Sequence, residues 1–169
     1  REGPILEGDE KYMMKASAKI SNIKGVDWSN IFRVSELASK IQLSKLTNTS
    51  WSLRNDSFKY NSLQALKKLN FAYLVYMNGF KNEENDYSFL DYNLSNDILA
   101  GYSDINRNKL NIFNNLILSG NGNHALYVHN RKFYWNSTEA YFEPIYYDGE
   151  FDLEKKQSKL NYPLSEKYL

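Results

Sequence analysis

The chain of 169 residues contains no cysteine and carries almost no net charge. Without a thiol it cannot form a disulfide, a zinc–thiolate site or a cysteine nucleophile. Its 21 Lys and Arg residues nearly balance 20 Asp and Glu residues, for a formal net charge of +1. So small a charge creates no field that would attract a polyanion, and we therefore expect no nucleic-acid partner. The absence of cysteine does not distinguish the cytosol from the exterior, so the compartment stays open.

Long hydrophobic runs are also missing. The longest uninterrupted apolar run covers only residues 71–77, whereas a membrane-spanning helix needs about 20 apolar residues. We therefore expect no membrane span within this sequence. The apolar fraction of 42% is nevertheless sufficient for one hydrophobic core, which predicts a single domain over residues 1–169.

Apolar residues recur at helical spacing in several segments. The clearest covers residues 62–78, where one face is apolar and Gly79 stands at the expected C-terminal cap. Further helices are expected over residues 11–20, 28–46, 94–102, 106–119 and 152–160, and a loop over residues 47–56. Six residues of the two strongest helical patterns should share one core: Leu66, Leu69, Tyr73, Leu110, Phe113 and Ile117.

Beyond Gly120 the pattern changes to aromatic and β-branched residues, which favour strands. Strands are expected over residues 126–128, 132–135 and 141–147, with a turn at Asn136-Ser137-Thr138 between the last two. Helices followed by a small hairpin give an α+β fold class.

Asn130 and the Asp148-Gly149 pair stand on either side of this expected hairpin. In protein kinases an Asn that ends the catalytic loop and an Asp that opens an Asp-x-Gly turn hold Mg²⁺ on the nucleotide from either side of a hairpin. A glycine after the Asp permits close approach of phosphate oxygens. The alternatives are an ordinary Asp-Gly turn and an Asn that bonds its own backbone.

Several short stretches together resemble the CotH-like (spore-coat protein H) atypical kinase family. They are Leu118-Ser119-Gly120-Asn121, His129-Asn130, Phe133-Tyr134 and Pro144-Ile145-Tyr146-Tyr147-Asp148-Gly149, with the opening Arg1-Glu2-Gly3-Pro4-Ile5-Leu6 and Asp9-Glu10. The resemblance covers residues 1–10 and 107–150. It implies the helical large-lobe portion of a protein-kinase-like fold, with a small β-hairpin that carries the metal site.

The resemblance also implies an activity and its cofactors. Asn130 and Asp148 would bind Mg²⁺ and ATP, and a phosphoryl group would pass from the nucleotide to Ser or Thr of a protein substrate. The nucleotide-binding Lys and Glu of the small lobe would precede Arg1. We therefore expect the chain, which does not open with Met, to be a fragment that is inactive alone.

The sequence departs from the family where a catalytic base is expected. In the family an Asp commonly follows the helix, but Gly122-Asn123-His124 contains no carboxylate. Either His124 substitutes as the catalytic group, Asn123 positions the acceptor, or phosphoryl transfer is lost. The last case leads to a second hypothesis, a non-catalytic surface or coat-assembly module, and keeps a cell-surface or extracytoplasmic location open.

The two histidines do not predict a zinc site. On a regular strand His124 and His129 would point to opposite faces, and neither lies in a known metal-binding spacing. For each of them the alternative to a functional role is a packing or hydrogen-bonding imidazole.

Overall fold

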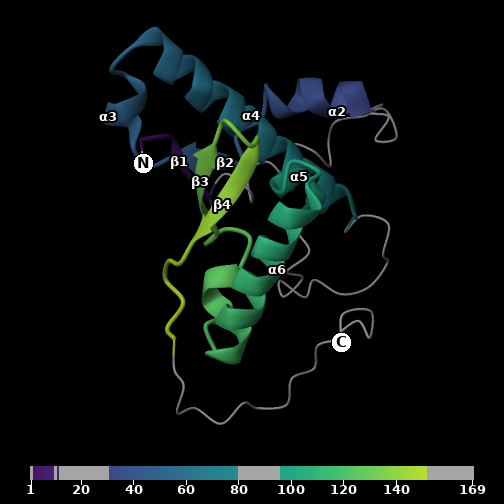
Figure 1. Ribbon diagram of the computed structural model, residues 1–169. Helices are drawn as coiled ribbons and strands as arrows, with labels where there is room; N and C mark the ends of the chain where they lie inside the picture. The colour runs from purple at the N-terminus through teal and green to yellow at the C-terminus, as the bar shows by residue number, and fades with distance from the viewer. Residues whose placement is uncertain (1, 10, 12–30, 80–95, 152–169) are drawn as a thin grey trace.

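The computed structural model describes residues 2–9, 11, 31–79 and 96–151 (Figure 1). The helices expected at residues 11–20 and 152–160 lie, apart from Lys11, outside these ranges. The described elements are β1 (Ile5–Gly8), α2 (Ile31–Ala38), β2 (Ser44–Leu46), α3 (Thr49–Ser52), α4 (Asp56–Gly79), α5 (Asn96–Leu99), α6 (Asp104–Ser119), the 3₁₀ helix η1 (Asn123–Leu126), β3 (Lys132–Asn136) and β4 (Tyr141–Ile145). The expected mixture of helix and strand is confirmed.

The strands form one antiparallel sheet in the order β2-β1-β3-β4. The short strand β1 lies in its interior and joins segments that are far apart in the sequence. Leu6 pairs with Leu46 on one side and Phe133 on the other, and Glu7 likewise pairs with Lys45 and Lys132. In Figure 1 the long helix α4 lies against this sheet, and α6 runs from α5 towards η1.

The helix predicted at residues 62–78 is confirmed within α4, which begins earlier, at Asp56. Its inner face buries Ala65, Leu69, Ala72 and Tyr73 completely. Leu63 is 54% exposed because the buried face at this end of α4 runs through Ser62 and Ala65, and Leu63 points away from that face. The helix predicted at residues 106–119 is also confirmed, with Ser103 as an N-cap that accepts a hydrogen bond from the Asn106 amide.

The prediction of one shared core is only partly right. Leu69, Tyr73 and Leu110 belong to the main core, and Leu66 packs at its edge. Phe113 and Ile117 instead join a second cluster, together with Ala125 and Leu126 of η1. The physical reason is that α6 runs past the sheet, so its C-terminal half packs on η1.

The prediction of a continuous helix over residues 28–46 is wrong. Helix α2 ends at Ala38, and the chain then extends into β2. The cause is the buried side chain of Asn70 on α4, which donates to the carbonyls of Ala38 and Ile41 and accepts from the Leu43 and Ser44 amides. These bonds satisfy the backbone where it leaves the helix, and β1 then pairs with β2.

Two further local predictions are corrected. Residues 47–56 contain the short helix α3, whose Trp51 stacks on Phe58 with ring centroids 4.2 Å apart. The strand expected at residues 126–128 is absent, because η1 and a following turn use local backbone bonds, including Asn130 N to Tyr127 O at 2.8 Å. The hairpin of β3 and β4 is confirmed, and Asn136 Oδ1 accepts from Thr138 N in its turn.

Candidate functional site

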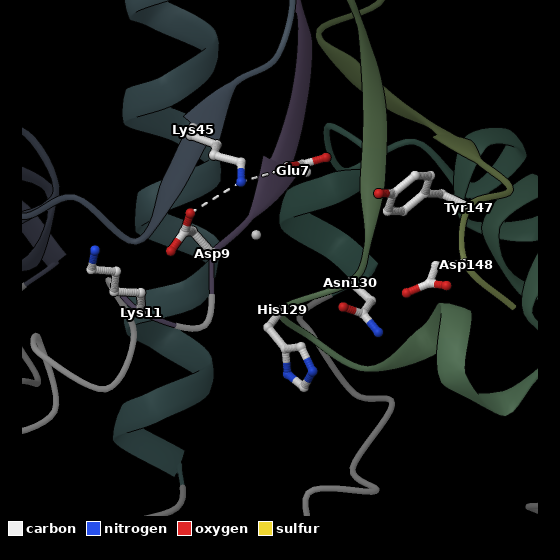
Figure 2. Close-up of a pocket in the computed structure, with 9 residues that line it drawn as sticks. Glu7, Asp9, Lys11, Lys45, His129, Asn130, Tyr147 and Asp148 are labelled. Carbon is white, nitrogen blue, oxygen red and sulfur yellow. Dashed lines mark ion pairs between the residues drawn. The ribbon is translucent and has the colours of Figure 1, made fainter.

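The β3–β4 hairpin brings its two flanking segments to one pocket of about 340 Å³. Asn130 precedes β3 and Asp148 follows β4, so closing the hairpin places them near each other. Both of the predicted metal ligands line this pocket. Its lining residues, drawn in Figure 2, are Glu7, Gly8, Asp9, Lys11, Lys45, His129, Asn130, Tyr147 and Asp148.

The side chain of His124 connects Asn130 to Asp148. Its Nδ1 lies 2.9 Å from the backbone carbonyl oxygen of Asp148 and 3.6 Å from the Oδ2 atom of the same residue. A carbonyl can only accept, so Nδ1 must be the protonated nitrogen. Asn130 Nδ2 lies 3.2 Å from both ring nitrogens, of which only the unprotonated Nε2 can accept a hydrogen bond from it. Both ring nitrogens of His124 are therefore used in holding the two predicted ligands.

Asn130 is held by its backbone and its amide nitrogen. Its N–H donates to Tyr127 O at 2.8 Å, and Nδ2 also lies 3.2 Å from the carbonyl oxygen of His124. These contacts direct the amide nitrogen towards η1, which leaves Oδ1 on the other side of the amide. In Figure 2 the Asp148 carboxylate is directed towards Asn130.

Asp148 has a left-handed backbone, with φ of 51°. Few non-glycine residues adopt this conformation, and it persists where surrounding contacts fix it. Its side chain is about half exposed, at 51%. The carboxylate is thus accessible while its backbone is fixed.

The predicted catalytic candidates Asn123 and His124 lie at the edge of this site. Asn123 opens η1, and neither of the two residues lines the pocket. His124 reaches the site through its contacts with Asn130 and Asp148, as described above. The second histidine, His129, does line the pocket, and its ring contacts Tyr127 with centroids 5.8 Å apart.

No sequence pattern assigned charged residues to the opposite wall of the pocket. Glu7 Oε1 pairs with Lys45 Nζ at 2.9 Å, and Glu7 Oε2 pairs with Lys132 Nζ at 3.1 Å. Lys45 Nζ also lies 3.2 Å from Asp9 Oδ2. Glu7 and then Asp9 raise the pKa of Lys45 through hydrogen bonds and charge. These charged residues could have been placed only from the register of β1 with β2 and β3. The wrong prediction of a helix over residues 28–46 prevented strand β2 from being expected.

Lys132 also connects this wall to the turn that carries Asp148. Its Nζ lies 3.6 Å from the ring centroid of Tyr147, the residue before Asp148. A cation over an aromatic face is stabilised by the ring quadrupole. The contact therefore links β3 to the segment after β4.

Arg131, next to Asn130, is buried with an exposed fraction of 2%. Its Nη2 donates to Asn114 Oδ1 at 3.0 Å, while Nη1 has no hydrogen-bond partner in the structure. Burial lowers the pKa of Arg131 to about 10. The side chain ties the start of β3 to α6, and its backbone carbonyl accepts from Gly8 N at 3.1 Å.

The donor set of the pocket suits one class of metal ion. Among the described residues there is no group of three or more His, Cys, Asp or Glu side chains that could hold a metal. A carboxylate at Asp148 and an amide oxygen at Asn130 nevertheless fit Mg²⁺. This ion commonly takes one or two protein carboxylates and fills its octahedron with water and phosphate oxygens. The residues therefore fit a metal shared with a phosphate ligand rather than one caged by protein alone.

None of the described helices is both long and apolar enough to cross a membrane. Comparison of the chain with protein-family models, with curated proteins and with solved structures finds no match.

Proposed function

We propose that the pocket between β1 and the β3–β4 hairpin binds a nucleoside triphosphate with Mg²⁺, as the large lobe of a kinase-like protein similar to the CotH-like family. The observation that carries the proposal is that His124 links Asn130 to Asp148, two residues that line one pocket. An ordinary Asp-Gly turn forms without a histidine that connects it to the residue before β3.

Each residue has a role that its contacts support. Asp148 and the Oδ1 atom of Asn130 would hold Mg²⁺, and the bound ion would neutralise charge on the phosphate oxygens. His124 keeps these two ligands in place. On the opposite wall Glu7 pairs with Lys45 and Lys132, and Asp9 also pairs with Lys45, so the charges there are balanced. The pocket volume of about 340 Å³ lies at the lower end of the range for small-molecule sites.

The proposed reaction is phosphoryl transfer to Ser or Thr of a protein substrate. Such transfer depends mainly on positioning and on electrostatic stabilisation of the phosphoryl group. Gly122-Asn123-His124 supplies no carboxylate as a base, and both His124 nitrogens are engaged. Catalysis would therefore depend on positioning, at a reduced rate.

The same observations support a second candidate, a non-catalytic CotH-like surface or coat-assembly module. Such a module could keep nucleotide binding as a structural feature without transferring the phosphoryl group. The engaged ring of His124 is the specific observation in its favour, because a base needs an available nitrogen.

Titration calorimetry with ATP, followed by a transfer assay, separates the candidates. The intact protein should bind ATP more tightly with Mg²⁺ than with EDTA, since the proposed site is completed by the metal. Mass spectrometry after incubation with ATP and Mg²⁺ should then detect phosphorylated Ser or Thr. Binding without phosphorylation would favour the non-catalytic module, and equal ATP affinity with and without Mg²⁺ would contradict the metal site.

A further inference from the structure

Two glycines after α6 lie directly beneath the turn that contains Asp148. A Cβ atom built on Gly120 would stand 1.9 Å from Cε2 of Phe151. One built on Gly122 would stand 3.3 Å from the carbonyl oxygen of Gly149. We call Gly120 and Gly122 the glycine pair, and residues 146–151 the Asp148 turn. The absence of side chains on the glycine pair is what allows the Asp148 turn to approach the end of α6.

The Asp148 turn is tightly wound. Asp148 and Glu150 both have left-handed backbones, with φ of 51° and 48°. Gly149 between them is buried, and its ideal Cβ would stand 2.4 Å from Tyr146 Cε2. Phe151 N donates to Tyr146 Oη at 3.1 Å, which closes the turn. Two left-handed non-glycine residues so close together need external contacts to hold them.

The end of α6 provides a fixed surface for those contacts. Gly120 N donates to Leu116 O at 3.2 Å, and Gly122 N donates to Ile117 O at 2.9 Å. These bonds cap the helix, so the position of the glycine pair follows from α6 itself. Ile117 in turn packs with η1 in the second hydrophobic cluster.

The Phe151 contact does little for the hydrophobic core. Its side chain is 49% exposed, and it belongs to neither core cluster. The ring packs edge-on against Tyr146, with centroids 6.2 Å apart, and against Gly120. A half-exposed ring on a glycine stabilises the fold weakly, but it determines where the turn can lie.

We infer that the glycine pair and Phe151 are positioning residues, which hold Asp148 at the distance from Asn130 that a shared Mg²⁺ requires. The inference rests on the proposed metal role of Asp148. Three contacts fix the Asp148 turn on α6 and η1: His124 at the Asp148 carbonyl, Phe151 on Gly120, and Gly149 O against Gly122. Of the residues in contact with the turn, the sequence associated His124 with the site, but not Gly120, Gly122 or Phe151.

The test compares Gly120→Ala, Phe151→Ala and the double variant in the intact protein. A methyl group at residue 120 must displace the Phe151 ring, and we expect the turn to move with the ring. The ATP affinity gained by adding Mg²⁺ should therefore fall about tenfold or more in Gly120→Ala, the scale expected for a misplaced site group. The ATP affinity of Gly120→Ala measured in EDTA should stay within about twofold of that of the unaltered protein. Without Mg²⁺ the nucleotide meets only pocket walls that the substitution does not change.

The double variant shows whether Gly120→Ala acts on Mg²⁺-dependent binding by displacing the Phe151 ring. If the added methyl acts by pushing the Phe151 ring, Gly120→Ala should do little more once the ring is absent, so the two effects should not add. Gly101→Ala is the control, because a Cβ atom there would also clash, 2.6 Å from Ala140 O, at a residue that does not line the pocket. It should lower thermal stability without changing the Mg²⁺ dependence.

A second measurement, hydrogen exchange, does not depend on ATP binding. Phe151→Ala is the suitable variant, because removing a half-exposed ring should not unfold the protein. Hydrogen exchange of the Asp148, Gly149 and Glu150 amides should become faster in Phe151→Ala and in Gly120→Ala, but not in Gly101→Ala. Faster exchange in a protein that binds no Mg²⁺ and ATP would contradict the proposed function while supporting the positioning role. Unchanged exchange and unchanged Mg²⁺ dependence in Phe151→Ala would overturn the inference.

Discussion

Replacing Asn70 with alanine should destabilise the fold more than any other substitution of one polar side chain on α4. Asn70 has an exposed fraction of 7% and makes five hydrogen bonds. Its Oδ1 accepts from the backbone N–H of Leu43 and of Ser44, at 3.1 and 3.0 Å, and from Ser44 Oγ at 2.9 Å. Its Nδ2 donates to the carbonyl oxygens of Ala38 and Ile41.

The magnitude follows from the groups that the substitution would leave unpaired. A buried donor or acceptor without a partner costs about 1–3 kcal/mol. Leu43 and Ser44 are fully buried, so water cannot easily replace Asn70 at their amides. We therefore expect Asn70→Ala to lower the free energy of unfolding by about 3–6 kcal/mol. This is a large part of the stability of an ordinary domain.

Asn61→Ala is the matched control, because it makes the same change on the same helix. Asn61 accepts one hydrogen bond, from Trp135 Nε1 at 3.1 Å, so its loss should cost about 1 kcal/mol. Urea denaturation followed by far-ultraviolet circular dichroism gives both values. Should Asn70→Ala prevent folding, Ser44→Ala removes a single bond of the network and should cost about 1 kcal/mol. Equal costs for Asn70→Ala and Asn61→Ala would refute the role assigned to Asn70.

Three further predictions concern the core and the titrating groups. Leu69→Ala should lower the free energy of unfolding by about 2–5 kcal/mol, while Leu63→Ala, at a 54% exposed position, should change it little. Burial raises the pKa of Tyr141 from 10.0 to about 12. Between these two pH values the folded state binds more protons than the unfolded state, so the free energy of unfolding should fall as the pH rises through this range. Tyr141→Phe should reduce this slope in alkaline denaturation curves, whereas Tyr102→Phe, at an exposed position, should not. Arg131→Met leaves the buried Asn114 Oδ1 without its donor and should lower the unfolding free energy by about 1 kcal/mol, whereas Asn114→Leu leaves a buried charge without its partner and should lower it by about 2–3 kcal/mol; the reverse order would contradict the burial of Arg131.

The parts of the fold that could be predicted are those set by local patterns. The helices at residues 62–78 and 106–119 show apolar periodicity over several turns, and the β3–β4 hairpin has an Asn-Ser-Thr turn between two aromatic segments. The proximity of Asn130 and Asp148 follows from the same hairpin, because both residues flank it. A local pattern was thus enough to bring the two candidate ligands to one pocket.

The rest depends on contacts between distant segments. Strands β1 and β2 have four and three residues, which is too short for an alternating pattern to be distinguished from a helix. Their pairing is decided by Asn70 and by the register with β3, and neither leaves a mark in the local sequence. Glu7, Asp9 and Lys45 therefore could not be assigned to the pocket in advance.

The role of the glycine pair was also beyond sequence reasoning. The stretch from Ser119 to Gly122 could be recognised as glycine-containing and as unlike a phosphate-binding loop that continues into Lys and Ser or Thr. That Phe151 lies on Gly120 depends on the path of the chain after β4. Only the three-dimensional structure reveals why those positions lack side chains.

The most direct test of the proposed metal site is the Mg²⁺-dependent affinity for ATP of Asp148→Asn, measured by titration calorimetry in the intact protein. The control is Glu150→Gln, which removes the same charge from the same turn at a residue that does not line the pocket. Loss of a Mg²⁺ ligand should abolish most of the affinity that Mg²⁺ adds in Asp148→Asn and leave it intact in Glu150→Gln. Equal Mg²⁺-dependent affinities for Asp148→Asn and the unaltered protein would contradict the metal assignment.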